Sequence, residues 1–336
     1  MQNKLFFQFD NYLRKIAIVD LKNKKKFTYA KIKKEFDLLN FLNNKKSIIF
    51  LIGNNDYETI ITYIYCLKNN LVPLLLDQNI DFFELENFIE SYKPKYIFFK
   101  KNSFKKINNA KIIGGYGEYL FFKFTKKINY KISKDLALLL TTSGSTGNKK
   151  LVRLSYNNIF FNTLSIIEYF KLNGSDSTIT TLPYNYSYGL SVINTHLQSG
   201  AKILLNTEQV TQRIFWNYFN NNKITGLYGV PSHFHIIKQL KITSFLKNKF
   251  KYAAVAGGSL DLPTLDYFSN LFRESNRKFY VMYGQTEASP RMTYLPPDML
   301  HLKKGSIGIA IPGGKIYFNK SKKTISRTNP AELIYK

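Results

Sequence analysis

The chain has 336 residues and a mass of 39.1 kDa, and it carries a formal net charge of +27 at pH 7. Hydrophobic residues make up 44% of it, which is enough for a globular core and too much for a disordered chain. Its one cysteine, Cys66, excludes an internal disulfide, and no apolar run approaches the length that spans a bilayer. The N-terminal residues lack the apolar segment of a signal peptide, so a cytoplasmic location is expected.

Apolar residues recur in alternation at helical and at strand spacing along the chain. Helices are expected at residues 27–42, 57–69, 83–92, 158–170, 189–199, 232–241 and 262–272. Strands are expected at residues 47–52, 71–76, 96–99, 136–140, 177–182, 201–205, 224–230, 252–256 and 278–282. Thr28 and Ser155 stand where helix N-caps belong. This order predicts an α/β fold with two stacked, doubly wound lobes and mainly parallel sheets.

Residues 102–133 interrupt the alternation with lysine, asparagine and glycine. The length of the chain is sufficient for two or three lobes. We therefore expect approximate lobes at residues 1–130 and 131–300.

A loop rich in glycine and hydroxyl side chains follows the strand expected at residues 136–140. Glycines let backbone N–H groups close on phosphate oxygens, hydroxyls add donors, and lysine adds positive charge. The GxxxxGK[ST] pattern of a P-loop does not fit the spacing. A polyphosphate site is the preferred interpretation, and a Gly/Ser surface linker is the alternative. The candidate phosphate-binding residues are Thr142, Ser143, Gly144, Ser145, Thr146, Gly147 and Lys150.

Two further segments follow expected strands, at the carboxyl ends where open α/β sheets bind ligands. Tyr283-Gly284-Gln285-Thr286-Glu287 offers a flat ring, a hydroxyl and a carboxylate oxygen suited to Mg²⁺. Gly257-Gly258-Ser259 allows a close approach of backbone to a ligand. Ordinary turns are the alternative for both segments.

Residues 141–152, TTSGSTGNKKLV, resemble the phosphate-binding signature of the adenylate-forming (AMP-binding) superfamily. That superfamily includes acyl-CoA synthetases, fatty-acid–AMP ligases and the adenylation domains of peptide synthetases. Lys149 departs from the proline or small apolar residue that usually precedes the motif lysine, here Lys150. YGQTE matches the family's YGxTE motif, and the resemblance runs in collinear order from about Phe27 to the last residue.

The resemblance implies ATP and Mg²⁺ as cofactors, with residues 142–150 on the β- and γ-phosphates. It implies that Thr286 contacts the α-phosphate and that Glu287 binds the metal, which makes these two the catalytic pair. Adenosine or AMP contacts are implied for Gly258, Ser259, Tyr283, Gly284 and Thr286.

Residues 182–190, LPYNYSYGL, resemble the turn that precedes the family's acyl-pocket helix. Many acyl-CoA synthetases have a gating histidine where this chain has Tyr186, so the acid that binds is left open. The resemblance assigns Tyr186, Tyr188, Gly189 and Gly257 to the acyl pocket. From residue type alone, Tyr184, Tyr186 and Tyr188 fit a pocket wall and a hydrophobic core equally well.

Residues 305–314 and 331–336 resemble the family's lead into a small β-barrel, whose start is expected at residues 301–336. In the family a ribose-binding aspartate follows, then a hinge and a small mobile C-terminal domain that contributes a lysine to adenylation. None of these is present in the 336 residues. The resemblance thus implies that residues 1–336 form an AMP-binding N-terminal domain, incomplete at its C-terminal end. Turnover by this chain alone is expected to be weak or lacking.

The leading hypothesis is a ligase that binds Mg·ATP and a carboxylic acid to form acyl-AMP, ancestrally an acyl-CoA ligase. CoA is a further expected cofactor, and a separate C-terminal domain or a carrier protein an expected partner. A nucleotide-binding module or decayed fragment without turnover is the alternative. A basic nucleic-acid binder is another, because a pI near 9.8 is typical of that class. The lysines are scattered from Lys4 to Lys336, which favours a general surface coat, so no specific nucleic acid is expected.

Overall fold

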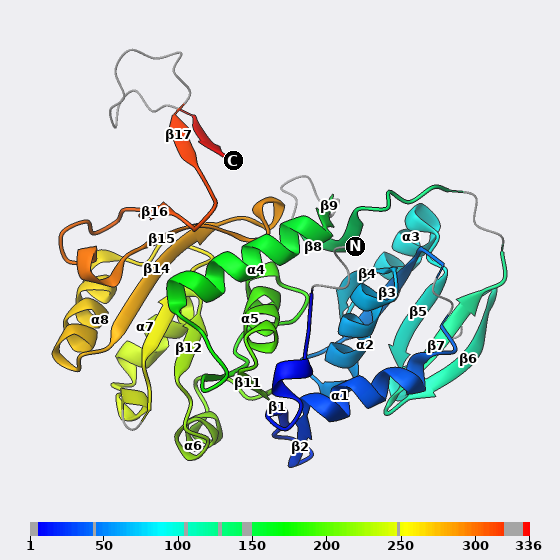
Figure 1. Ribbon diagram of the computed structural model, residues 1–336, viewed down its shortest axis with the longest axis horizontal. Helices are drawn as coiled ribbons and strands as arrows, with labels where there is room; N and C mark the ends of the chain where they lie inside the picture. The colour runs from blue at the N-terminus through cyan, green and yellow to red at the C-terminus, as the bar shows by residue number, and fades with distance from the viewer. Residues whose placement is uncertain are drawn as a thin grey trace.

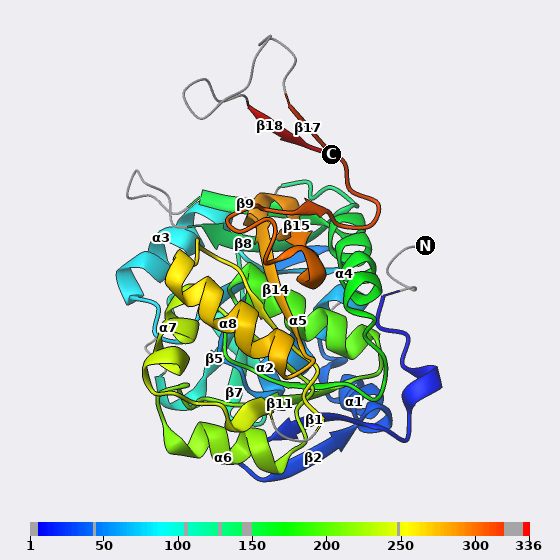
Figure 2. The ribbon, with the colours of Figure 1, turned by 90° about the vertical axis from the view of Figure 1, so that its left-hand side faces the viewer.

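The computed structural model describes residues 6–42, 45–103, 107–126, 130–142, 150–246, 249–318 and 332–336. Two large sheets lie side by side, and helices pack on both (Figures 1 and 2). The prediction of an α/β fold with two lobes and mainly parallel sheets is confirmed.

The seven-stranded sheet has the order β6-β7-β5-β3-β4-β8-β9. Its centre, β5-β3-β4-β8, is parallel, while β6, β7 and β9 run antiparallel to their neighbours. β3 is buried along its whole length, as expected for a parallel strand covered on both faces. The strands are β3 (Ser47–Gly53), β4 (Leu71–Asp77), β5 (Tyr96–Lys100), β6 (Ala110–Tyr116), β7 (Tyr119–Phe124), β8 (Leu136–Thr142) and β9 (Lys150–Ser155).

The nine-stranded sheet has the order β16-β15-β14-β13-β12-β10-β11-β1-β2. The strands from β14 to β1 are parallel, and β2, β15 and β16 are antiparallel at the two edges. The strands are β1 (Ile16–Asp20), β2 (Lys25–Thr28), β10 (Ser177–Ile179), β11 (Lys202–Leu205), β12 (Gly226–Gly229), β13 (Tyr252–Val255), β14 (Lys278–Gly284), β15 (Arg291–Leu295) and β16 (Ile309–Ala310).

Five of the described helices begin after side chains that accept hydrogen bonds from the first helical turn. Thr28 caps α1 and Ser155 caps α4, as predicted, and the Ser155–Asn158 pair forms a capping box. Asp56, Asp81 and Asp261 cap three more helices in the same way. The helices are α1 (Tyr29–Glu35), α2 (Tyr57–Lys68), α3 (Phe82–Tyr92), α4 (Tyr156–Phe170), α5 (Ser187–Gln198), α6 (Arg213–Asn221), α7 (Pro231–Gln239) and α8 (Leu262–Glu274).

Several antiparallel elements differ from the pattern predicted from the sequence. Residues 102–133 contain β6 and β7, which form a hairpin at the edge of the seven-stranded sheet. Strands β9 and β15 and helix α6 were not predicted from the sequence. The single helix expected at residues 27–42 is divided into β2, α1 and a 3-10 turn, Phe36–Leu39. The short tight turn after α1 is a common way for a helix to end.

The chain crosses between the sheets at two places. β1 and β2 come first in the sequence but join the nine-stranded sheet, β3 to β9 form the seven-stranded sheet, and the chain re-enters the nine-stranded sheet at β10. The two sheets therefore do not coincide with residues 1–130 and 131–300, and that division remains a prediction about domains.

A small separate hairpin, β17 (Ile316–Phe318) with β18 (Leu333–Tyr335), stands off the body near the C-terminus (Figures 1 and 2). This small sheet lies within residues 301–336, where the sequence analysis expects a small β-barrel to start. Within the described ranges, every helix is too short or too polar to cross a membrane.

Tyr184 joins the two halves of the molecule. It precedes α5, is 1% exposed, and its hydroxyl lies 2.6 Å from the carbonyl oxygens of Leu51 on β3 and Leu76 on β4. The backbone N–H of Gly53 donates to the same hydroxyl at 3.1 Å. Asn55 adds a second link by donating to the Leu182 carbonyl at 2.9 Å. Tyr184 is therefore part of the buried junction and not a pocket wall.

We expect Tyr184→Phe to lower the free energy of unfolding by about 1–3 kcal/mol, because it removes the buried hydrogen bonds that the hydroxyl makes to backbone groups of β3 and β4. Urea denaturation measures the change. Tyr130→Phe is the matched control, because the Tyr130 hydroxyl donates at the surface, to the Lys93 carbonyl at 2.9 Å. Its loss should change stability by no more than about 0.5 kcal/mol. Equal losses in the two variants would contradict this assignment of Tyr184.

Candidate active site

Two of the predicted segments lie next to each other at the carboxyl edge of the nine-stranded sheet. β13 and β14 are parallel neighbours, with Val255 opposite Val281. The residues after each strand, Gly257-Gly258-Ser259 and Tyr283 to Glu287, therefore emerge at the same edge. This is the position where open α/β sheets bind ligands.

The strands that carry the predicted phosphate-binding residues reach the same place. Thr142 at the end of β8 and Lys150 at the start of β9 are paired opposite each other. β9 in turn contacts the 3-10 turn Thr286–Ala288. The predicted Ser143, Gly144, Ser145, Thr146 and Gly147 lie outside the described residues. The described ends of that segment nevertheless stand beside the YGQTE turn.

Thr286 is paired with a hydroxyl that the sequence did not single out. The Thr286 Oγ1 and Ser187 Oγ atoms are 2.9 Å apart, and either can donate. Ser187 is the first residue of α5, so this contact ties α5 to the YGQTE turn. Glu287 is exposed beside Thr286, and the Tyr283 ring is 40% exposed and available for stacking.

A small hollow of about 70 Å³ opens among these elements. It contains predicted residues of both the acyl group (Tyr186, Tyr188, Gly257) and the nucleotide group (Tyr283, Gly284, Thr286). It is lined by residues at the start of α5, directly after β13, at and after the end of β14, and at the start of β15, namely Tyr186, Ser187, Tyr188, Ala256, Gly257, Met282, Tyr283, Gly284, Gln285, Thr286, Pro290 and Arg291.

The walls of the hollow are tightly built. Gly257 has φ +84°, and a Cβ there would lie 2.5 Å from the Tyr186 hydroxyl oxygen. Tyr188 is buried and donates to the Ala254 carbonyl at 2.9 Å, and burial raises the pKa of its hydroxyl. Gly189 does not line the hollow. It packs against the Pro183 carbonyl, which a Cβ at this position would overlap. Gly258 and Ser259 are exposed next to the hollow without lining it.

Arg291, on β15, was also missed and is the most unusual residue of the site. It is 2% exposed, and its guanidinium carbon lies 4.8 Å from the Tyr188 ring centre and 5.4 Å from that of Tyr228. Burial opposes its charge, yet the neighbouring tyrosines raise the pKa of Arg291 overall. Each ring contact of this kind contributes roughly 0.5–2 kcal/mol. The arginine is therefore held in place by aromatic faces.

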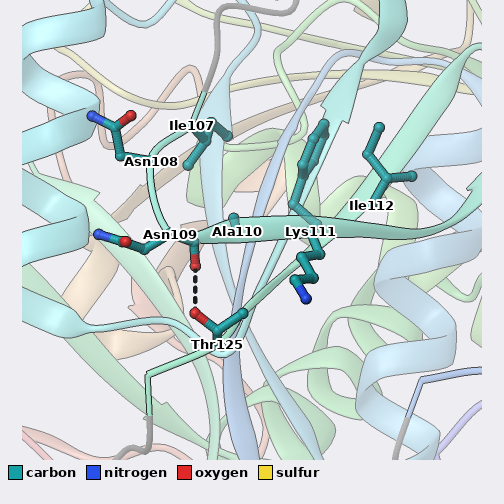
Figure 3. A pocket seen from close by; sticks show the side chains of 8 residues that line it. Ile107, Asn108, Asn109, Ala110, Lys111, Ile112 and Thr125 are labelled. Atoms are coloured by element: carbon teal, nitrogen blue, oxygen red, sulfur yellow. Dashed lines mark hydrogen bonds between the residues drawn. The ribbon is translucent and has the colours of Figure 1, made fainter.

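Two other hollows contain none of the predicted site residues. One, of about 500 Å³, lies along the edge strand β6, where the Thr125 hydroxyl donates to the Asn109 carbonyl at 3.3 Å (Figure 3). Its lining includes the charged Lys111 and no acidic side chain among the described residues. The other, of about 410 Å³, lies near Asn55, Asn206 and His233. Neither brings nucleotide-binding groups together.

The residues present suit a magnesium ion that is held mainly by phosphate. Mg²⁺ in nucleotide enzymes binds one or two carboxylates and completes its shell with substrate oxygens and water. The exposed carboxylate of Glu287 beside the Thr286 hydroxyl fits this pattern. No group of three or more His, Cys, Asp or Glu side chains is placed for metal binding in the described part of the chain.

The paired sheets and the site at their carboxyl edge define an adenylate-forming type of domain. Residues 5–336 match the family described as AMP-binding enzyme, and the chain belongs to that family. The resemblance drawn from the loop and the YGQTE motif is thereby confirmed.

Curated relatives are CoA ligases. Acyl-CoA ligase SidI of Aspergillus fumigatus is 30% identical over 190 residues, which are 54% of this chain and 31% of that ligase. Oxalate–CoA ligase of Saccharomyces cerevisiae is 26% identical over 230 residues, 67% of this chain and 39% of that one. The chain thus spans about a third to two fifths of the length of these relatives.

Solved structures share the fold over nearly the whole chain. VinN has a TM-score of 0.80 at 17% identity, covering 100% of this chain and 87% of VinN. The o-succinylbenzoate CoA synthetase MenE of Bacillus subtilis, in complex with the acyl-adenylate intermediate OSB-AMP, has a TM-score of 0.78 at 18% identity. That match covers 98% of this chain and 86% of the MenE chain.

We expect Gly284→Ala to lower the free energy of unfolding by several kcal/mol, because the new Cβ would overlap the carbonyl of Pro290, the residue just before the paired strand β15. Gly258→Ala is the control. Its Cβ would meet only the Pro231 ring, at 3.3 Å, and should cost less than about 1 kcal/mol. Urea denaturation compares the two. Equal stability of both variants would show that the β14–β15 turn is not the close backbone contact described here.

Proposed function

We propose that this chain binds Mg·ATP and a carboxylic acid at the carboxyl edge of β13 and β14 and joins them to give acyl-AMP and pyrophosphate. The observation that carries the proposal is the meeting of three elements: β9 from the phosphate segment, the turn Thr286–Ala288, and Ser187 at the start of α5. Family membership supports the same chemistry.

In the proposed reaction a carboxylate oxygen attacks the α-phosphorus of ATP. The bond from that phosphorus to the bridging oxygen breaks, and pyrophosphate leaves. Thr286 donates its hydroxyl hydrogen to the α-phosphate while its oxygen accepts from Ser187. Tyr283 stacks on adenine, and the exposed Gly258-Ser259 backbone faces the nucleoside. Catalysis of this kind rests on positioning and charge stabilisation, so it requires no side-chain nucleophile.

The remaining positive charge comes from Lys150 and from the metal. Lys150 is exposed at the start of β9, with its side chain free to reach the terminal phosphates. Mg²⁺, held by Glu287, would neutralise phosphate charge when bound. The names of the relatives support CoA as the acceptor, but they differ in the acid, which ranges from oxalate to medium-chain acids.

We further propose that a small C-terminal domain, on the same polypeptide or a separate one, supplies the lysine that the resemblance implies. A carrier protein in place of CoA, and a cytoplasmic location, remain predictions from the sequence.

Thermal unfolding with Mg·ATP tests nucleotide binding. A ligand at 100 times its Kd stabilises the native state by about 2.7 kcal/mol, so the midpoint should rise by several degrees. Glu287→Gln should lose most of the magnesium-dependent part of that rise. Glu274→Gln, which removes the same charge from the exposed end of α8, should behave as wild type. No rise at millimolar Mg·ATP would contradict the proposal. Strong, steeply salt-dependent binding of a random duplex in that case would support the nucleic-acid alternative.

Acid-dependent exchange of labelled pyrophosphate into ATP tests the chemistry. Exchange by residues 1–336 should be slow and should rise by roughly 10²–10³ when a C-terminal domain bearing the lysine is added, because one charge contact at the reacting phosphate is worth that much. Lys150→Ala should cost less than omission of that domain, because the phosphate segment has other donors. The exposed Lys34→Ala should have no effect. Nucleotide binding without exchange in any combination would favour a binding module without turnover.

A further inference from the structure

Arg291, which lines the active-site hollow, carries a positive charge that no carboxylate of the described residues pairs with. Every acceptor of its guanidinium hydrogens within the described ranges is neutral. Its Nη1 donates to the Tyr169 hydroxyl at 3.0 Å and to Met282 Sδ at 3.2 Å, and Nη2 donates to the Ser191 hydroxyl at 3.2 Å.

The aromatic residues around Arg291 do not supply the missing negative charge. Burial raises the pKa of the Tyr169, Tyr188 and Tyr228 hydroxyls, so these phenols stay protonated at neutral pH. Ring faces attract a cation through their quadrupoles and leave its net charge unchanged. A buried charge without a counter-ion is unfavourable, and an anion that enters beside it is correspondingly attracted.

Arg291 also has unused hydrogen-bond donors. A guanidinium carries five N–H hydrogens, and the contacts above use three. Nε is buried and has no partner. A hydrogen on Nη2 remains as well. Nε and Nη2 form one edge of the guanidinium, and this edge matches the two oxygens of a carboxylate.

Arg291 borders the hollow, so a small anion bound there would lie next to the arginine side chain. Arg291 lines it together with Tyr186, Tyr188 and Gly257, and Thr286 and Gly284 line its nucleotide side. Its volume of about 70 Å³ accommodates only a few heavy atoms, since one water needs roughly 10–15 Å³ of cavity space. A fatty chain does not fit in this space, whereas one end of a short acid does.

We propose that the acid bound here is a short dicarboxylic acid, with its second carboxylate on Arg291 and its reacting carboxylate toward Thr286. This inference rests on the proposed function, because it assigns the substrate class of the same site. Arg291 is then the residue that selects the acid. The rings of Phe170, Tyr188 and Tyr228, here called the aromatic cage, hold its guanidinium in position before the acid binds.

Binding of matched acids to the wild-type chain provides the first test. Isothermal titration calorimetry in the presence of α,β-methylene-ATP and Mg²⁺ would compare malonate, succinate, monomethyl succinate and butyrate. We expect a diacid to bind at least ten-fold more tightly than butyrate. Monomethyl succinate, which retains the length of succinate but loses one charge, should bind like butyrate.

Variants of the arginine provide the second test. Arg291→Met should abolish the preference for the diacid while Mg·ATP still raises the unfolding midpoint, and Arg291→Lys should restore only part of the preference because it lacks the two-donor edge. Arg273→Met, a change at an exposed arginine of α8, is the control and should retain the full preference. If Arg291→Met does not fold, the wild-type comparison of succinate with its monomethyl ester still decides the question.

Equal binding of succinate and its monomethyl ester, no binding of any diacid, or a preference that survives Arg291→Met would each overturn the assignment of Arg291. Pyrophosphate exchange separates this failure from failure of the proposed function. Exchange supported by monocarboxylic acids alone would overturn the diacid inference and leave the ligase activity intact. No exchange with any acid, together with no stabilisation by Mg·ATP, would defeat the proposed function itself.

Discussion

The candidate site depends on how the two sheets are held against each other, because its parts come from both. β9 belongs to the seven-stranded sheet, while the YGQTE turn and α5 belong to the nine-stranded side. The buried polar contacts of Tyr184 and Asn55 fix this arrangement at the carboxyl ends of β3 and β4. Any shift of one sheet along the other would leave desolvated backbone groups without partners. Such contacts therefore specify one orientation, which apolar packing alone does much less strictly.

The aromatic cage stabilises the buried positive charge of Arg291. An arginine in a dry site would normally lower its free energy by moving toward water or toward an acidic residue. Here Phe170, Tyr188 and Tyr228 surround the guanidinium, and the hydroxyls of Tyr169 and Ser191 fix its orientation. These contacts stabilise the charge without neutralising it. The site thus favours a negatively charged group before any acid binds, in contrast to pockets that select an acid by shape alone.

The sequence was most informative where local signals are strong. The apolar runs of β3 and β4, the caps Thr28 and Ser155, and the YGQTE turn were all recognisable from neighbouring residues. β9 and the β6–β7 hairpin were not, because antiparallel edge strands expose alternate residues and contain lysine and glycine. Ser187 and Arg291 were missed for a different reason. Their partners lie about a hundred residues away, and an arginine is seldom fully buried, so residue type pointed to the surface.

The placement of β1 has a consequence for how the polypeptide folds during synthesis. Ile18 pairs with Ile203, and β1 lies at an inner position of its sheet with β2 on its other side. At about 5–20 residues per second, the roughly 185 residues between them take on the order of 10–40 s to emerge from a ribosome. Throughout that interval the β1–β2 ribbon exposes a strand edge whose partner has not yet been made. The nine-stranded sheet is thus completed late, and a nascent chain of this kind is a natural client for chaperones that shield unpaired strands.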